Sequence, residues 1–245
     1  MKKHILFLVT EDWYFISHRL NFALYLLENG YRVSVACGDT GKLNSLSKYG
    51  LKCHKVNWNR SSISVLNAFR DLFKIIMILR ITKPDIFHLV SMRSILIGMF
   101  SSFFSLKTKI VVTFTGLGFI FLGKDINKKI FRNIVIIYLN VLLKIKRSTI
   151  IVVQNIDDAK YLSKVLNIKL KKISIIRGSG INLEKFKVLN LPKSKPIVFA
   201  YVGRLIKDKG VQVLFEAFSK LNAIKYNFNL IIAGSIDSKN PTSIS

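Results

Sequence analysis

Acidic residues are scarce in this sequence. Only 13 of its 245 residues are Asp or Glu, against 39 Lys and Arg, which leaves a formal net charge of +26. So strong a positive balance indicates an anionic partner, such as nucleic acid, anionic lipid or a phosphorylated small molecule. Half of the residues are hydrophobic. This content excludes a disordered basic tail, because such chains lack the apolar residues needed to fold.

Cysteine and long hydrophobic runs are also rare. Cys37 and Cys53 are the only two cysteines and no CxxC pair occurs, so neither a disulfide framework nor a zinc site is supported. The longest apolar candidates, Ile134–Leu143 and Ser94–Leu106, fall short of the roughly 18–20 residues of a spanning helix. The run Ile5–Val9 near the N-terminus is too short for a signal peptide. We therefore expect a folded cytoplasmic protein.

Short runs rich in Ile, Val and Phe alternate with segments of helical period, which is the pattern of repeated βαβ units. The predicted strands are His4–Thr10, Arg32–Cys37, Leu51–Trp58, Asp85–Val90, Lys109–Phe114, Thr149–Gln154 and Ile173–Ile176. The predicted helices are Ser17–Glu28, Ser62–Arg80, Arg93–Phe104, Asn127–Lys144 and Asp157–Leu166. Such units form an α/β fold, a parallel sheet with helices on both faces.

A lysine-rich stretch with Pro192 and Pro196 interrupts this pattern. Beyond it, we predict a strand at Ile197–Val202, a helix at Val211–Leu221 and a strand at Phe228–Ala233. The chain is thus predicted to hold a complete Rossmann-like domain at 1–187, a linker at 188–195 and the first βαβ unit of a second Rossmann-like domain at 196–245. About fifty residues are too few for a doubly wound sheet to bury its own faces.

The segment Gly203–Gly210 lies between a predicted strand and a predicted helix, at the sheet edge where ligands bind. Gly203 would let the backbone approach a ligand, while Arg204 and Lys209 would project cations toward phosphate oxygens. A helix beginning near Lys209 would add backbone N–H groups for an anion. The alternative is an ordinary basic surface turn.

Two further candidate segments follow predicted strands. Thr10–Arg19 joins the first strand to the first helix and holds two carboxylates, a histidine and an arginine, although Asp12 or Ser17 could merely cap a helix. Thr113–Phe119 contains a GxG, which a tight turn explains equally well. Of the four histidines, we single out only His18, since the other three lie in predicted strands.

The segment Lys124–Arg147 combines Lys and Arg with many aliphatic residues and has a single acid, Asp125. A basic helix with an apolar side suits an anionic membrane surface. Because this helix lies between two strands, we expect its apolar side to be buried and its basic face and one end to contact the membrane. No nucleic-acid-binding module is present, so we expect no nucleic acid partner.

The sequence lacks a DxD pair, a GxxxxGK[ST] loop, a GxSxG elbow and an HExxH motif. The usual carboxylate pair for a metal–nucleotide complex is therefore absent. No GxGxxG follows the first strand, which disfavours a nucleotide-cofactor oxidoreductase.

Several segments in order along the chain resemble those of the bacterial family 4 glycosyltransferases that build surface polysaccharides. They are Glu11-Asp12-Trp13 with Ser17-His18-Arg19, Thr113–Gly118, Gln154–Asp158, Arg177–Asn182 with Phe186, and Gly203-Arg204-Leu205 with Lys209-Gly210-Val211. The resemblance implies a GT-B fold of two facing Rossmann-like domains. It also implies retaining transfer of a sugar from a nucleotide-diphosphate sugar to a polyprenyl-diphosphate saccharide, for capsule, O-antigen or exopolysaccharide.

The resemblance also implies roles for residues. Gly203, Arg204 and Lys209 would bind the donor diphosphate, with no metal and no further cofactor. The protein would lie peripherally at the inner face of the plasma membrane, with an anionic membrane surface as a partner. The acceptor-side candidates are Glu11, Asp12, His18, Arg19, Thr115, Gly116 and Gly118.

Two features depart from the family pattern. Thr115 stands where many members carry a histidine, so no catalytic residue is carried over. The family's C-terminal domain normally continues well beyond this length and includes an E-x7-E element that binds the donor. We therefore expect a truncated chain with little or no transfer activity of its own. The alternative is an inactive remnant, or a membrane-surface or partner-binding protein without catalysis.

Overall fold

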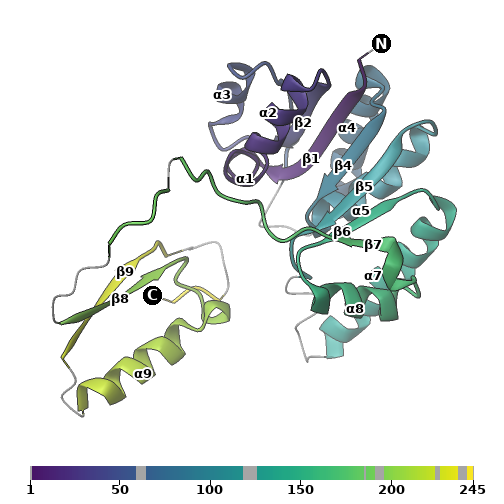
Figure 1. Cartoon of the computed structure of the whole chain (residues 1–245). Helices are drawn as coiled ribbons and strands as arrows, with labels where there is room; N and C mark the ends of the chain where they lie inside the picture. Colours follow the sequence, from purple (N-terminus) through teal and green to yellow (C-terminus); the bar gives the residue numbers. More distant parts are fainter. Residues whose placement is uncertain are drawn as a thin grey trace. The chain divides into compact units, whose positions relative to one another are not determined.

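The computed structural model of the chain describes residues 2–58, 65–117, 126–184, 186–190, 196–223, 227–236 and 242–244. The chain divides into two compact units, Met1–Ile181 and Asn182–Ser245. The first unit contains a seven-stranded sheet and the second a two-stranded one (Figure 1). The predicted linker at 188–195 falls within the second unit and its residues 191–195 lie outside the described ones, so the predicted domain boundaries stay a prediction.

The sheet of the first unit is entirely parallel, in the order β3-β2-β1-β4-β5-β6-β7. Its strands are β1 (His4–Glu11), β2 (Arg32–Gly38), β3 (Lys52–Lys55), β4 (Ile86–Val90), β5 (Lys109–Phe114), β6 (Ile150–Val153) and β7 (Ile173–Ile175). The interior strand β1 pairs with β2 on one side and β4 on the other. The chain order reverses between these strands, which makes the β1/β4 edge the topological switch point, where ligands bind in open α/β sheets.

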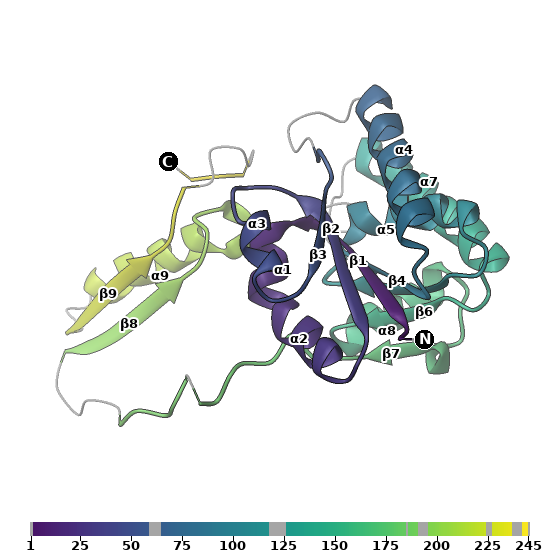
Figure 2. The same ribbon diagram turned by 90° about the horizontal axis from the view of Figure 1, so that it is seen from above.

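Helices cover the sheet from both sides, as predicted (Figure 2). On one face lie α1 (Asp12–His18), α2 (Leu20–Glu28) and α3 (Leu43–Ser47). On the other lie α4 (Val65–Thr82), α5 (Met92–Ser101), α7 (Ile126–Ile145) and α8 (Ile156–Val165). Short 3-10 turns, η1 (Ser102–Phe104) and η2 (Leu170–Lys172), follow α5 and precede β7. Right-handed crossovers produce this division. The strands β1 to β3 are added toward one edge of the sheet and β4 to β7 toward the other edge, so right-handed connections place the two sets of helices on opposite faces.

Alternation along the strands separates two hydrophobic clusters. Phe7 and Val35 point to the α1–α3 side and pack with Phe15, Ala23 and Leu46. Leu6 and Leu89 point to the opposite side, in the cluster that includes Ile75, Leu139 and Leu162. Since successive strand residues face opposite sides of a sheet, an unbroken apolar strand fills both clusters at once.

The two faces of the sheet are not covered equally. Helices α1, α2 and α3 contact β1, β2 and β3 respectively, and among the described helices none packs over β5 and β6 on that side. Val111 and Gln154 on this part of the sheet are only half-buried, and Ile176 just after β7 is exposed. The α1–α3 side is therefore open beyond β4.

The structure corrects the sequence prediction on this side of the sheet. A separate helix, α1, occupies most of the segment Thr10–Arg19, which was predicted to be a loop followed by a helix from Ser17. Helix α3 was not predicted, because its five residues are too few to show a helical period. β3 is shorter than the predicted Leu51–Trp58, since Trp58 leaves the ladder and donates from its indole Nε1 to the Val9 carbonyl at 3.0 Å.

The second unit consists of β8 (Ile197–Val202), the 3-10 turn η3 (Lys207–Lys209), α9 (Val211–Ala223) and β9 (Phe228–Ala233). The two strands pair in parallel, which makes this unit a single βαβ motif. Both strands have the bounds predicted from the sequence. Across the described part of the chain, no helix combines the length and the apolar content needed to span a bilayer.

Gly98 of α5 marks the closest approach of a helix to the sheet. A Cβ atom at this position would lie 2.4 Å from Leu89 Cδ2 and 3.0 Å from Leu8 Cδ2, both on fully buried side chains. We expect Gly98→Val to lower the free energy of unfolding by about 1–3 kcal/mol through overpacking. In a Leu89→Ala background, Gly98→Val should lower the free energy of unfolding by less, because the Cδ2 atom with which the new side chain would clash is absent. Urea unfolding of the two single variants and the double variant measures this coupling, and strictly additive losses would contradict the packing described.

Candidate functional site

The carboxyl end of β1 leads directly into α1, which carries several acceptor-side candidates. Glu11 is the last residue of β1 and Asp12 the first of α1, and both are buried. The helix ends at His18, and Arg19 leaves helical geometry with φ −130° and ψ −15° before α2 begins. A carboxylate in the first turn also favours the helix start, because it faces the positive end of the helix dipole.

Asp12 holds two loops together. Its Oδ2 atom accepts hydrogen bonds from the backbone N–H groups of Thr40 and Lys42, each at 2.8 Å, and its Oδ1 accepts from the Thr40 hydroxyl and from the Trp13 N–H. Burial by itself would raise the pKa of Asp12, but these hydrogen bonds outweigh it and the pKa is lowered. Because its oxygens are engaged by these donors, Asp12 anchors the β2–α3 connection to the start of α1.

Glu11 and His18 also make local contacts. The indole Nε1 of Trp13 donates to Glu11 Oε2. His18 is exposed, its ring stacks on Tyr14 with centroids 4.5 Å apart, and its Nδ1 lies 2.6 Å from the Ser17 hydroxyl. The Trp13–Glu11 hydrogen bond orders the β1–α1 junction. The contacts with Tyr14 and Ser17 orient His18 at the edge of the sheet.

Arg19 is the unusual cation of this region. Its side chain is 9% exposed, and its Nε and Nη2 atoms are buried with no hydrogen-bond partner among the described residues. Its backbone N–H donates to the Phe15 carbonyl at 2.8 Å, which fixes where the side chain starts. A buried guanidinium without an anion is costly, so this arrangement indicates a place for an anionic group.

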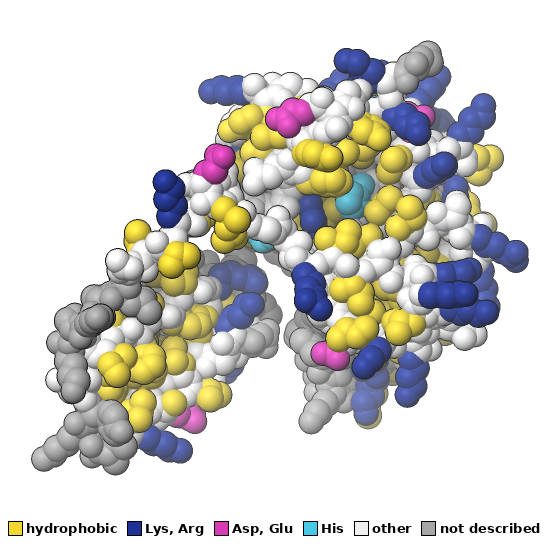
Figure 3. Space-filling model, viewed as in Figure 1, with side chains coloured by type: hydrophobic (Ala, Val, Ile, Leu, Met, Phe, Trp, Pro, Cys, Tyr) yellow, Lys and Arg dark blue, Asp and Glu magenta, His cyan; other side chains and the backbone are white. Residues whose placement is uncertain are grey.

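A cavity of about 450 Å³ lies beside Arg19 on the open side of the sheet. Figure 3 shows hydrophobic side chains gathered around a histidine on this face of the first unit, with Lys and Arg at the rim. The apolar lining includes Phe22, Ile86, Val111, Val152 and Ile176. The polar lining is His18, Arg19, Tyr31, His88, Thr113, Gln154 and Ser179. The cavity thus combines apolar walls with a few polar groups, as small-molecule sites do.

His88 lies in this cavity although the sequence suggested only a structural role. Its Nε2 is 2.8 Å from the Thr113 hydroxyl and its ring packs against Phe7 at 4.9 Å. Burial first, and the nearby Arg19 charge second, lower the pKa of His88 to about 3. The imidazole is therefore neutral at pH 7, and it does not compete with Arg19 for an anion.

Only part of the predicted acceptor side comes together at the cavity. Of the candidates, His18 and Arg19 line it, whereas Glu11, Asp12, Thr115 and Gly116 do not. Gly116 follows β5 with a φ of +124°, a turn conformation that favours glycine. Gly118 lies outside the described residues. Sequence reasoning missed His88, although a histidine on the face opposite Phe87 and Leu89 could have signalled it. Thr113 and Gln154 belong to segments that the sequence did single out, but neither was named as a site residue.

In the second unit, Gly203 follows β8 and its N–H donates to the Ala233 carbonyl at the end of β9. A Cβ atom on Gly234 would lie 2.0 Å from the Gly203 carbonyl oxygen, so the two strand ends meet where only glycine fits. Arg204 and Lys209 are both exposed. Lys209 lies in η3 and not at a helix start, because Gly210 in the left-handed region ends that turn and α9 begins at Val211.

Within the described ranges, no group of three or more His, Cys, Asp and Glu side chains is placed to hold a metal ion. The expectation that the protein works without metal or cofactor stays a prediction.

A seven-stranded parallel sheet covered by helices on both faces, followed in the chain by a parallel βαβ unit, is the arrangement found in α/β proteins of the GT-B class. A solved glycosyltransferase from Rickettsia africae has the same fold, with a TM-score of 0.67 and 21% identity, over 96% of this chain and 61% of that one. The predicted fold class is confirmed.

The sequence comparisons are more specific. The model of the family described as glycosyl transferase 4-like matches residues 4–155, and that of glycosyl transferases group 1 matches residues 182–243. Since the first match spans more than half of the chain, the protein belongs to the glycosyl transferase 4-like family. The family predicted from the sequence is thereby confirmed.

Two curated relatives are similar in sequence over most of this chain and about half of their own length. The capsular polysaccharide biosynthesis glycosyltransferase CapM of Staphylococcus aureus is 24% identical over 192 residues, which are 74% of this chain and 49% of that protein. The N,N'-diacetylbacillosaminyl-diphospho-undecaprenol alpha-1,3-N-acetylgalactosaminyltransferase of Campylobacter jejuni is 25% identical over 220 residues, which are 84% of this chain and 55% of that protein. The chain spans about half the length of these relatives.

The Asp12 hydrogen bonds predict a stability effect. Asp12→Asn would place an amide N–H₂ or a single oxygen against the N–H groups of Thr40 and Lys42, so we expect the free energy of unfolding to fall by at least about 2 kcal/mol. Because the pKa of Asp12 is lowered, this advantage of the carboxylate is present above its unfolded pKa and disappears as the pH falls through the folded one. Urea unfolding at pH 7 tests this, with the exposed Asp157→Asn as the matched control. Equal losses in both variants would mean that Asp12 does not hold these loops.

The lowered pKa of His88 predicts a pH effect of its own. The unfolded chain binds a proton near pH 6.5 that the folded chain refuses until about pH 3, so stability is lost as the pH falls from about 6.5. Between pH 7 and pH 5 this single group should cost about 2 kcal/mol. His88→Gln, which retains a partner for Thr113, should reduce the drop measured by urea unfolding at the two pH values. A drop of unchanged size in the variant would show that His88 titrates normally.

Proposed function

We propose that this protein takes part in the transfer of a sugar from a nucleotide-diphosphate sugar to a saccharide carried on polyprenyl diphosphate, in the synthesis of capsule, O-antigen or exopolysaccharide. Family membership supports glycosyl transfer. The names of the two relatives support the acceptor class, because one is a capsular polysaccharide enzyme and the other acts on a diphospho-undecaprenol saccharide.

The single observation that carries the acceptor assignment is the buried guanidinium of Arg19. Arg19 lines the cavity, so a diphosphate there would lie beside a guanidinium whose Nε and Nη2 have no hydrogen-bond partner among the described residues. Arginine binds phosphate oxygens well, and a small shift of its side chain would turn these two donors toward the ligand. His88 stays neutral and so leaves the positive charge to Arg19. The apolar walls would pack against the non-polar parts of the acceptor, while Gln154 and Ser179 offer hydrogen bonds at its edge.

On the donor side, the loop Gly203–Gly210 supplies the cations. Arg204 and Lys209 would bind the diphosphate and stabilise the negative charge that develops on it as the glycosidic bond breaks. In a retaining front-face reaction, the acceptor hydroxyl attacks from the side on which the nucleoside diphosphate leaves. A phosphate oxygen of the leaving group then accepts the hydroxyl proton. Two side-chain cations fulfil this electrostatic role without requiring a metal.

A polyprenyl carrier is confined to a membrane, so the proposed acceptor also implies where the protein works. We propose peripheral association with the inner face of the plasma membrane, through an anionic lipid surface. The net charge of +26 supports this, because positively charged segments near an anionic leaflet are attracted to it.

Nucleotide binding tests the donor site. Titration calorimetry with UDP, GDP and ADP should detect a complex with one of them, and Arg204→Ala or Lys209→Ala should each weaken it about tenfold, since a hydrogen bond to a charged group contributes about 1.5–3 kcal/mol. Lys220→Ala, which removes an exposed cation in the last turn of α9, is the control and should leave the affinity unchanged. Absence of binding by the unmodified chain, or equal affinities in all variants, would contradict the assignment of Arg204 and Lys209 to the donor site.

A further inference from the structure

Helix α7 has two apolar sides, and only one of them faces the core. Val135, Leu139 and Leu142 are buried against the sheet, which agrees in part with the burial expected from the sequence. A second row of aliphatic side chains points away from the core at spacings of three and four residues, so it forms one continuous stripe on the outer side of the helix. The members of this α7 stripe are Ile130, Ile134, Ile137, Val141 and Ile145, all exposed.

Helix α4 carries a matching stripe. Phe69, Phe73, Met77 and Ile81 recur every four residues and are all exposed, whereas Ile75, Ile78 and Leu79 of the same helix are buried. Helices α4 and α7 both contact α5 and lie on the same side of the sheet (Figure 2). The two stripes therefore belong to one outer surface of the first unit.

Such exposure has a physical meaning. Isolated apolar side chains are common on protein surfaces, but extended apolar rows on neighbouring helices mark interaction sites. Ile137 is 63% exposed and Phe73 is 67% exposed, values that would be expensive for residues with no partner. The stripes therefore require an apolar partner surface.

The charges on the same two helices restrict the class of partner. Arg70, Lys74 and Arg80 accompany the α4 stripe, and Lys129 and Lys144 the α7 stripe, all five exposed. The sequence of α7 contains no Asp or Glu. Asp71 of α4 is buried and receives a hydrogen bond from Arg93 Nη2 at 3.2 Å, so it presents no negative charge outward. An apolar stripe with cations alone on its flanks matches an anionic lipid surface.

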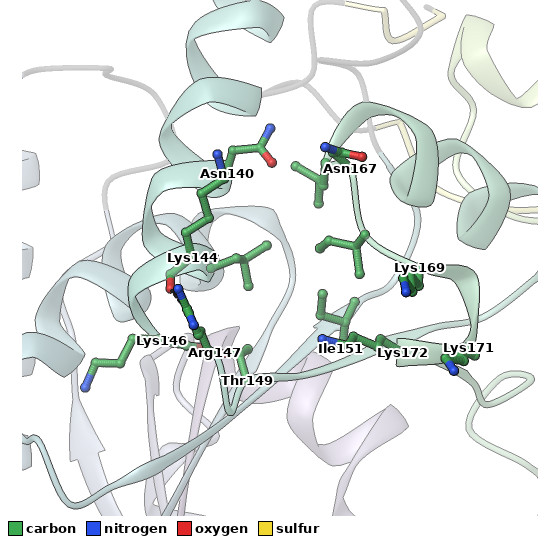
Figure 4. A pocket seen from close by; sticks show the side chains of 13 residues that line it. Asn140, Lys144, Lys146, Arg147, Thr149, Ile151, Asn167, Lys169, Lys171 and Lys172 are labelled. Atoms are coloured by element: carbon green, nitrogen blue, oxygen red, sulfur yellow. Dashed lines mark hydrogen bonds between the residues drawn. The ribbon is translucent and has the colours of Figure 1, made fainter.

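A basic basin adjoins the end of the α7 stripe. It is a cavity of about 610 Å³ at the amino ends of β6 and β7, and none of the described residues that line it is Asp or Glu. Figure 4 shows Lys144 and Arg147 at and just beyond the C-terminal end of α7, and Lys169, Lys171 and Lys172 on the segment that leads into β7. Lys146 points away from these cations and donates to the Ser102 carbonyl at 3.1 Å. Lys144 lines the basin and directly precedes Ile145, the last member of the α7 stripe, so the basin lies at the end of α7 where the stripe ends. Phosphate oxygens are the natural partners of such a group of cations.

We propose that α4 and α7 dock the first unit onto an anionic bilayer, with the two apolar stripes in the interfacial layer and the basic basin on lipid headgroup phosphates. The proposal rests on the proposed function only in that a lipid-linked acceptor places the protein at a membrane. It adds the face, the residues and the mode of contact. It also differs from the sequence expectation, in which the apolar side of this helix was buried and the contact came from its basic face and one end.

Vesicle flotation tests the stripes. The unmodified chain should float with vesicles of phosphatidylglycerol and phosphatidylcholine and not with phosphatidylcholine alone. Ile137→Glu should lower the bound fraction about tenfold, because a charge would enter the apolar interface. Ile156→Glu is the matched control, since Ile156 is an exposed isoleucine on α8 outside both stripes, and it should bind as the unmodified chain does. Ile137→Gln, which is milder and should lower binding to a lesser extent, guards against a folding defect, and circular dichroism confirms the fold of each variant.

A charge-reversal pair tests the basin. Lys169→Glu/Lys171→Glu should lower binding at least tenfold at about 0.1 M NaCl and less at about 0.5 M, where screening already weakens the attraction. Lys48→Glu/Lys52→Glu makes the same charge change near the β3 edge of the sheet, opposite to β7, and should have a much smaller effect. If both charge-reversal pairs lose the same fraction of vesicle binding, the basin contributes only through the net charge of the protein. That result would overturn this part of the proposal.

Two results would overturn the proposal as a whole. One is failure of the unmodified chain to bind anionic vesicles. The other is a dimer in sedimentation that Ile137→Glu converts to a monomer without changing vesicle binding, since a second copy of the chain would then cover the stripes. Flotation contains neither sugar donor nor acceptor. A chain that floats but binds no nucleotide would contradict the proposed function and leave this inference standing. A chain that binds a nucleotide but does not float would contradict this inference and leave the proposed function standing.

Discussion

The parallel pairing of β1 with both β2 and β4 is the constraint on which the rest of the structure depends. Both faces of β1 are buried, with Phe7 in one hydrophobic cluster and Leu6 in the other. This fixes the register of the whole sheet, because a slip of one residue would exchange the two faces. It also places the carboxyl end of β1 at the switch point, where Asp12 ties the following helix to the β2–α3 connection.

The handedness of the crossovers then distributes the helices unequally. Among the described helices of the first unit, α1, α2 and α3 alone lie on one face, and they cover β1 to β3 but not the neighbouring part of that face. The cavity forms at this border, where the start of α2 meets β4 and β5. Arg19 and His88 are buried there side by side, one charged and one neutral. The same topology that leaves the face open thus creates the electrostatic feature on which the proposed acceptor site depends.

On the opposite side of the sheet, α4 and α7 each have two apolar faces. Their inner faces complete the core, and their outer faces carry a second apolar row between cations. Such helices differ from ordinary amphipathic ones, whose outer face is polar. If α4 and α7 dock on a membrane as proposed, the helices that stabilise the sheet also orient it against the bilayer.

The sequence by itself determined the α/β class, the parallel order of βαβ units and most element bounds, because strand periodicity and turn residues are local signals. It also carried the family resemblance, which the comparisons confirm. It did not reveal that Arg19 is buried, that His88 joins it, or that Asp12 is occupied by Thr40 and Lys42. These depend on contacts between strands and loops distant in sequence. Nor could it separate the two apolar rows of α7, since both are aliphatic and both have helical spacing. Only the packing of α7 against the sheet decided which row is core and which is surface, because burial depends on which side of a helix meets its neighbours.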